Sequence, residues 1–132
     1  MTLTRERARE VLATYIKAWQ EQDPALIVSI FTEDATYHER VLAAPIPDRE
    51  AIRLYWEGKV AREQANITCD LLAMYVDGDT LVAEWLATFD DLVKGERKRM
   101  REVAIMEFRG DLVCSLREVW ASETIGQLAA RG

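Results

Sequence analysis

The sequence has few metal-binding or disulfide-forming side chains: among 132 residues there are two cysteines and one histidine. Cys69 and Cys114 are far apart, form no CxxC pair and lie in apolar, strand-like stretches. Two buried free thiols are therefore expected rather than a disulfide. The single histidine, His38, cannot join them in any recognisable zinc-ligand spacing. We expect neither a metal nor an organic cofactor.

Long apolar runs and an excess of basic residues are also missing. No run approaches the ~18 apolar residues of a membrane span, and the first residues lack the apolar core of a signal peptide. We therefore expect a cytoplasmic protein with no membrane partner. The formal charge of −6 disfavours nucleic acid as a partner. One basic run, Lys94 to Arg101, is either a solvated hairpin tip or an anion-binding patch.

No linker or low-complexity segment interrupts the chain, so residues 1–132 are expected to form one domain. The N-terminal half has helical periodicity with clear helix starts. Thr4 and Asp48 are candidate N-caps, and Asp23 directly precedes a proline at a first helical position. These signals predict three helices and a strand, over 4–21, 23–32, 35–40 (the strand) and 48–64.

The C-terminal half has alternating apolar residues divided by three glycine turns, at Gly78, Gly95 and Gly110. The predicted strands are about twice the usual ~5–6 residues, so their twist must coil the sheet around the helices. The expected fold class is α+β, with a curved antiparallel sheet wrapped around three N-terminal helices. The strands, joined as sequential hairpins, are predicted over 65–76, 80–93, 97–108 and 111–121. The tail, 122–132, is expected as a helical turn or as disorder.

The predicted strand 80–93 carries apolar residues on both faces. Helices can cover only one face of a single curved sheet, so the other face would remain wet in a monomer. We therefore expect a homodimer in which the outer faces of two sheets meet.

Candidate site residues come from alternation along the strands. Tyr37 and Glu39 must share one face, while His38 points to the other and is expected to be structural. Glu118 lies in an apolar stretch, where an ionised carboxylate is costly. Either Arg101, Arg117 or a neighbouring strand neutralises it at an edge, or it is a pocket acid with a raised pKa.

Glu39 has two interpretations as well. It is either a rim carboxylate paired with Arg40 or Arg49, or a side chain that points into a pocket. If Glu39 and Glu118 face each other, repulsion and desolvation would keep one of them protonated near neutral pH. One cavity would then hold both an acid and a base.

The order of elements, together with the phrases FTEDATYHE at 31–39 and DREAIR at 48–53, resembles the SnoaL-like branch of the nuclear transport factor 2-like superfamily. The resemblance covers nearly the whole chain. It implies an α+β cone with a pocket between the concave sheet face and the helices. The fold hosts ketosteroid isomerases, limonene-epoxide hydrolases, polyketide cyclases, dehydratases and members with no catalytic role.

The resemblance also implies roles for individual residues. Tyr15 looks like the tyrosine with which ketosteroid isomerases donate a hydrogen bond to an oxyanion. Glu39 falls where those enzymes keep their general base, and Ala104 falls where they keep a second donor.

Against the epoxide hydrolases, Tyr37 and Glu39 fall on residues that hold the attacking water. Glu118 falls on the last-strand carboxylate that acts as base. The arginine and aspartate of the hydrolases' third strand correspond to Trp85 and Ala87.

Two functions from different classes follow from this resemblance. The first is an acid/base enzyme without a cofactor, an isomerase, cyclase, dehydratase or hydrolase, that acts on a hydrophobic small molecule. The second is a binding or assembly module without turnover. The aromatic side chains of the expected pocket could also be simple core residues. The expected catalytic residues are Glu118, Glu39, Tyr15 and Tyr37, and the expected pocket wall is Trp19, Trp56, Trp85, Ala87 and Ala104.

Overall fold

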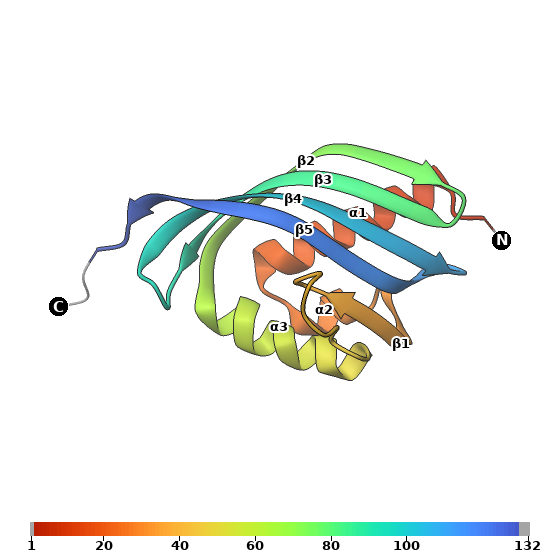
Figure 1. Cartoon of the computed structure of the whole chain (residues 1–132), viewed down its shortest axis with the longest axis horizontal. Coiled ribbons are helices and arrows are strands. Elements are labelled where there is room, and N and C mark those ends of the chain that lie inside the picture. The colour runs from red at the N-terminus through yellow and green to blue at the C-terminus, as the bar shows by residue number, and fades with distance from the viewer. Residues whose placement is uncertain (1, 130–132) are drawn as a thin grey trace.

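The computed structural model describes residues 2–129 and arranges them as three helices and one five-stranded sheet. Figure 1 shows the long strands arching over α1, with α2 and α3 on the same concave side. None of the helices in this part of the chain is long and apolar enough to cross a bilayer. The elements are α1 Arg5–Glu21, α2 Pro24–Val28, β1 Phe31–His38, α3 Arg49–Glu63, β2 Gln64–Asp77, β3 Thr80–Asp91, β4 Glu96–Arg109 and β5 Leu112–Gln127.

Side-chain caps define the helix starts that the sequence predicts. The side chains of Thr4, Asp23 and Asp48 each accept a hydrogen bond from a backbone N–H in the first turn of α1, α2 and α3. Each cap satisfies one of the N–H groups that a helix start leaves without an internal partner. At its other end α1 closes on Gln22, which has the left-handed φ of 55°.

The strands form one sheet in the order β1-β5-β4-β3-β2. Strands β2 to β5 pair antiparallel as successive hairpins, and β1 adds to β5 in parallel. The inner face of β3 is almost completely buried against the helices, which confirms the predicted fold class. Its inward side chains are Leu81, Ala83, Trp85, Ala87 and Phe89.

The boundary between α2 and β1 differs from the prediction. The expected helix to residue 32 ends at Val28, and β1 begins at Phe31 instead of residue 35. Pairing with β5 explains the difference, because Phe31 lies opposite Val113 and the Val113 N–H donates to the Ile30 carbonyl at 2.8 Å. The tertiary contact outweighs the local helical pattern.

The tail prediction is wrong for residues 122–127, which continue β5 as an extended strand (Figure 1). Gln127 pairs with Glu96 at the start of β4. Because β4 already begins at Glu96, its first residues offer backbone groups that the end of β5 satisfies. Residues 130–132 lie outside the described part of the chain.

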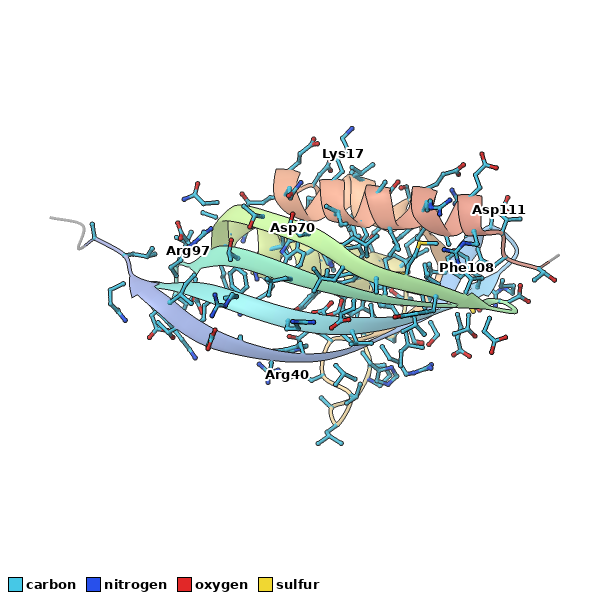
Figure 2. The ribbon with its side chains drawn as sticks, turned by 90° about the horizontal axis from the view of Figure 1, so that it is seen from above. Lys17, Arg40, Asp70, Arg97, Phe108 and Asp111 are labelled. Atoms are coloured by element: carbon cyan, nitrogen blue, oxygen red, sulfur yellow. The ribbon has the colours of Figure 1, made fainter. Side chains whose placement is uncertain are left out.

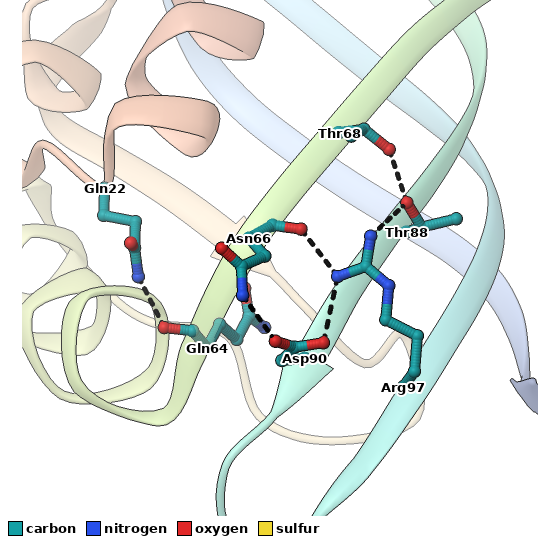
Figure 3. Close-up of polar contacts among 7 residues, drawn as sticks. All are labelled: Gln22, Gln64, Asn66, Thr68, Thr88, Asp90 and Arg97. Carbon is teal, nitrogen blue, oxygen red and sulfur yellow. Dashed lines mark hydrogen bonds and ion pairs between the residues drawn. The ribbon is translucent and has the colours of Figure 1, made fainter. Parts of the chain in front are cut away.

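Most of the basic run forms ion pairs with acids, three of them on a neighbouring strand and one within β4. The guanidinium of Arg97 on β4 donates hydrogen bonds to the Asp90 carboxylate on β3 at 3.0 Å and to the Asn66 carbonyl on β2 at 2.7 Å. It also donates to the Thr88 hydroxyl on β3 (Figure 3). These contacts agree with the hairpin-tip alternative rather than with a free anion patch. The other ion pairs of the run are Lys98 with Glu96, Arg99 with Glu123 and Arg101 with Glu84.

The two cysteines are free, but only Cys69 is buried. The expectation that both are buried is wrong for Cys114, which is half-buried. A bulge causes this, because Val113 pairs with Phe108 and Ser115 with Glu107, so that Cys114 is an extra residue between two pairs. The alternation that the sequence suggested breaks at this position.

The thiols should therefore react at different rates. Burial raises the pKa of the Cys69 thiol to about 12, which leaves little thiolate at neutral pH. We expect a disulfide reagent to label Cys114 first in the native protein, and Cys69 only after unfolding. A Cys114→Ser variant should lose the fast phase alone. Equal native rates for both thiols would contradict this.

Candidate functional site

A cavity of about 200 Å³ lies between the helices and the inner faces of β4 and β5. Its β4 wall, Lys98 to Glu102, lies near Arg97, at the opposite end of the sheet from Phe108 (Figure 2). The lining combines aromatic rings with carboxyl groups. The rings are those of Tyr15, Trp19, Tyr37, Tyr55, Trp56, Phe89 and Trp120, and the carboxyls are those of Glu39, Glu63, Asp91, Glu102 and Glu118.

Secondary structure explains how these side chains meet. Tyr15 and Trp19 are four residues apart in α1 and so lie on one helix face. Glu118 and Trp120 are two residues apart in β5 and share the inner sheet face. Tyr37 comes from β1, which pairs directly with β5: Tyr37 lies opposite Leu116.

Glu118 is the centre of a buried hydrogen-bond network. The hydroxyls of Tyr15 and Tyr37 each donate to its Oε1 atom at 2.7 Å, and the two hydroxyl oxygens are 3.3 Å apart. Two donors on one oxygen stabilise the ionised carboxylate. Both tyrosine protons are therefore engaged with Glu118.

Burial nevertheless dominates the pKa of Glu118, which is 5 % exposed. Desolvation raises its pKa to about 7, although the hydrogen bonds from Tyr15 and Tyr37 lower it. No counter-charge comes from the two expected arginines, because Arg117 pairs with Glu107 and Arg101 pairs with Glu84. Of the two alternatives drawn from the sequence, the buried acid with a raised pKa describes its surroundings.

Glu102 on β4 is a further buried acid that the sequence reasoning missed. It is 3 % exposed, and Ala104, its neighbour on the inner face of β4, lies opposite Glu118. Burial first, and then the negative charge of Glu118, raise the pKa of Glu102 well above its usual range. The larger upward shift of its pKa makes Glu102 the acid that keeps its proton, and Glu118 the first of the two to ionise.

Glu39 lies at the cavity rim just after β1. Its side chain is 24 % exposed and lies 3.4 Å from the Arg40 guanidinium, while its backbone carbonyl accepts a hydrogen bond from the Trp120 indole at 2.9 Å. The two interpretations of Glu39 thus describe one position, a rim carboxylate that also lines the cavity. Its negative charge contributes to the raised pKa values of Glu102 and Glu118.

The expected pocket wall is only partly correct. Trp19 and Trp56 line the cavity, whereas Trp85, Ala87 and Ala104 are fully buried and do not reach it. These three face the concave side as expected, but α1 covers that stretch of the sheet. Trp85, for example, packs on Tyr15 with ring centroids 4.9 Å apart.

Two other side chains complete the comparison with the sequence. Tyr55 lines the cavity from α3 although it was not expected there, and His38 is absent from the lining. Within residues 2–129, no three His, Cys, Asp or Glu side chains are grouped so as to hold a metal ion. The chemically competent groups are therefore one carboxylate that can accept a proton and one carboxylic acid that can donate it.

A sequence profile of the SnoaL-like domain matches residues 12–116, most of the chain. A search of curated proteins finds no significant match.

Three solved structures show the same fold at low identity. The epoxide hydrolase/cyclase-like enzyme SalBIII, described in pyran ring formation of the polyether salinomycin, has 22% identity and a TM-score of 0.78, over 92% of this chain and 97% of that one. A Catenulispora acidiphila protein with a ketosteroid isomerase-like fold, in complex with trimethylamine, has 19% identity and a TM-score of 0.74, over 83% and 84%. A limonene-epoxide-hydrolase-like enzyme of Mycobacterium tuberculosis has 12% identity and a TM-score of 0.73, over 88% and 84%.

Proposed function

We propose, from the premise that the chain belongs to the SnoaL-like domain family, that its cavity is the active site of a small acid/base enzyme acting on a hydrophobic molecule. One observation carries the proposal: two buried carboxyls line one cavity, and two tyrosine hydroxyls donate hydrogen bonds to one of them. Pairs of titratable groups whose surroundings shift their pKa values apart are typical of acid/base sites. If the two acids had only a structural role as ion-pair partners, a cationic side chain would have to lie beside them.

The geometry gives each residue a role. Glu118, as the carboxylate, removes a proton from a carbon acid or from an attacking water. Tyr15 and Tyr37 keep it ionised near neutral pH and aim its free oxygen. Glu102 returns a proton to the substrate oxygen, so that proton uptake and delivery balance. Isomerisation, cyclisation, dehydration and epoxide opening all need this pair of transfers.

These roles change two expectations from the sequence. Tyr15 and Tyr37 were expected to donate to a substrate oxygen, but both hydroxyls donate to Glu118. Glu39 was expected as the second member of the acid/base pair. Glu102 is buried on the inner face of the strand next to that of Glu118, whereas Glu39 is partly exposed beside Arg40, so we assign Glu39 to the rim.

The proposal is tested with generic probes of acid/base chemistry. We expect the protein to catalyse exchange of α-protons of a small hydrophobic ketone in heavy water, followed by NMR, or hydrolysis of a small hydrophobic epoxide. The rate should rise with pH through about 7, where burial places the pKa of Glu118, because only the carboxylate is a base. Absence of both activities over a broad panel, or a rate with no inflection near neutral pH, would refute the assignment.

The second candidate function is a ligand-binding module without turnover. The observation that favours it is the cavity volume of about 200 Å³, which is below the ~300–1,000 Å³ of most ligand pockets. A fold relative that holds a small amine agrees with a small ligand. Tight binding of a ligand without chemical change, at every pH, would favour this alternative.

We also propose that the chain is a homodimer through the outer face of its sheet. Neighbouring positions there carry Val103 on β4 and Val119 on β5, which pair directly, and Val119 is 53 % exposed. We expect light scattering to give twice the 15.1 kDa of the chain. Val119→Lys should shift the mass toward the monomer, whereas Val41→Lys, on the exposed loop after β1, should not. A wild-type monomer at micromolar concentration would refute the interface.

A further inference from the structure

The two buried acids of the cavity have no cationic side chain paired with them in the described part of the chain. Glu102 and Glu118 are both buried, and neither takes part in any ion pair of the described residues. The Glu102 carboxyl accepts no hydrogen bond from an N–H group, and its Oε2 atom has no donor in this part of the chain. A buried carboxyl in these surroundings either keeps a proton or binds a positive ligand.

The walls around these carboxyls are aromatic. Tyr15 packs edge-on against Trp19 and Trp56, and Tyr37 packs against Tyr55. All five rings line the cavity. The face of an aromatic ring carries negative potential and attracts cations, most strongly where water is excluded. Rings and carboxyls together favour a ligand that is both apolar and positively charged.

A side chain of the protein already shows this mode of binding at the mouth. The Arg40 guanidinium lies 5.0 Å from the centroid of the Trp120 ring and 3.4 Å from the Glu39 carboxylate. An exposed cation thus sits between an aromatic face and an acid of the cavity rim. Lys59, Lys94 and Lys98 also line the cavity, but no ion pair of the described residues joins any of them to Glu102 or Glu118.

We infer that the cavity binds a hydrophobic ammonium ion, a tertiary or quaternary amine, with the Glu102–Glu118 pair as its counter-charge and the surrounding rings as its cage. The inference rests on the site of the proposed function and names the class of its substrate or ligand. Binding requires the pair to carry one negative charge. In the fully protonated pair the proton of Glu118 is released to solvent as the cation enters.

The affinity should therefore depend on pH. Burial places the pKa of Glu118 near 7, so the counter-charge is present above that pH and lost below it. Other ionisable groups line the same cavity from each packed element. They are Tyr15 from α1, Tyr37, Glu39 and Arg40 from β1 and its loop, Tyr55, Lys59 and Glu63 from α3, and Asp91, Lys94 and Lys98 around the β3–β4 turn. Cys69 on β2 lies close enough for Glu102 to raise its pKa.

The test compares choline with dimethylbutanol, its neutral isostere in which carbon replaces the charged nitrogen. By calorimetry we expect choline to bind at least about tenfold more tightly, since the shapes match and only the charge differs. Choline affinity should increase between about pH 6 and about pH 8, with protons released on binding. Equal affinity for the two probes, no pH dependence, or no choline binding at millimolar concentration overturns the inference.

A matched pair of variants locates the effect. Glu118→Gln removes the carboxylate that carries the counter-charge while keeping the side-chain shape, and it should weaken choline about tenfold without weakening dimethylbutanol. Glu107→Gln, on the exposed face of the sheet, should bind both probes as the wild type does. Should Glu118→Gln fail to fold, Glu39→Gln at the rim is the second variant, and it too should weaken choline alone. Unchanged choline affinity in the folded variant overturns the role of the acids.

Failure of this inference is distinguishable from failure of the proposed function, because binding is measured without turnover. A protein that binds choline selectively but shows no activity refutes the enzyme and keeps the ammonium site. A protein that turns over a neutral ketone and prefers dimethylbutanol refutes the ammonium site and keeps the enzyme.

Discussion

Replacing Glu118 by glutamine is expected to lower turnover about 100- to 10,000-fold, the usual cost of losing a general base. The amide retains a carbonyl oxygen that can accept the hydrogen bonds from Tyr15 and Tyr37, so the network and the cavity shape should persist. What disappears is the ability to take up a proton. The loss should therefore appear in kcat, while binding of an uncharged ligand changes little.

The matched control is Glu107→Gln, which makes the same chemical change outside the cavity. Glu107 pairs with Arg117 at 2.7 Å on the exposed face of the sheet. Exposed pairs contribute little to stability, so activity and melting temperature should stay near those of the wild type. The catalytic role is wrong if Glu118→Gln keeps full activity but melts at a much lower temperature, which would make Glu118 a structural residue.

Most of the fold could be predicted because local signals agree with the tertiary structure. The turns expected at Gly78, Gly95 and Gly110 all have positive φ, of 60°, 67° and 64°, which glycine adopts without strain. The errors occur where pairing between distant strands decides the outcome. Both β1 and the end of β5 became strands because a partner strand offered hydrogen bonds.

The site was predictable in part for the same reason. Alternation identifies which face of a strand Tyr37 and Glu118 occupy, and the SnoaL-like resemblance implies that this face is concave. Alternation does not say how deep a residue lies along that face. Trp85 and Ala104 therefore face inward as expected, yet they form core beneath α1, whereas Glu102, two residues along from Ala104, reaches the cavity.

Glu102 had a sequence signal that the basic run obscured. It alternates in phase with Ala104, Met106 and Phe108, all of them buried, so it is a lone acid on an apolar face. Glu102 directly follows the basic run that ends at Arg101, and one interpretation of that run is a solvated hairpin tip. The position of Glu102 beside Glu118 depends on the β4–β5 register, which no local pattern encodes.

The buried pair should also make the protein less stable as pH rises. Desolvation lifts the pKa of Glu118 from 4.5 to about 7, so between these values the native state binds more protons than the unfolded state. The free energy of unfolding then falls with increasing pH, and this carboxyl alone accounts for a loss of about 3 kcal/mol by pH 7. Glu102, whose pKa burial also raises, adds to the loss in the same direction.

Urea unfolding between about pH 5 and about pH 8 measures this dependence. Wild type and Glu107→Gln should both lose stability across the range. Glu118→Gln and Glu102→Gln should show a smaller loss, and Glu102→Gln should exceed the wild type at the upper pH. A wild-type stability that is constant or increases with pH would mean that the pair is solvated or matched by a cation. The link to function is direct, because the same desolvation that costs stability gives Glu118 a pKa suited to proton transfer near neutral pH.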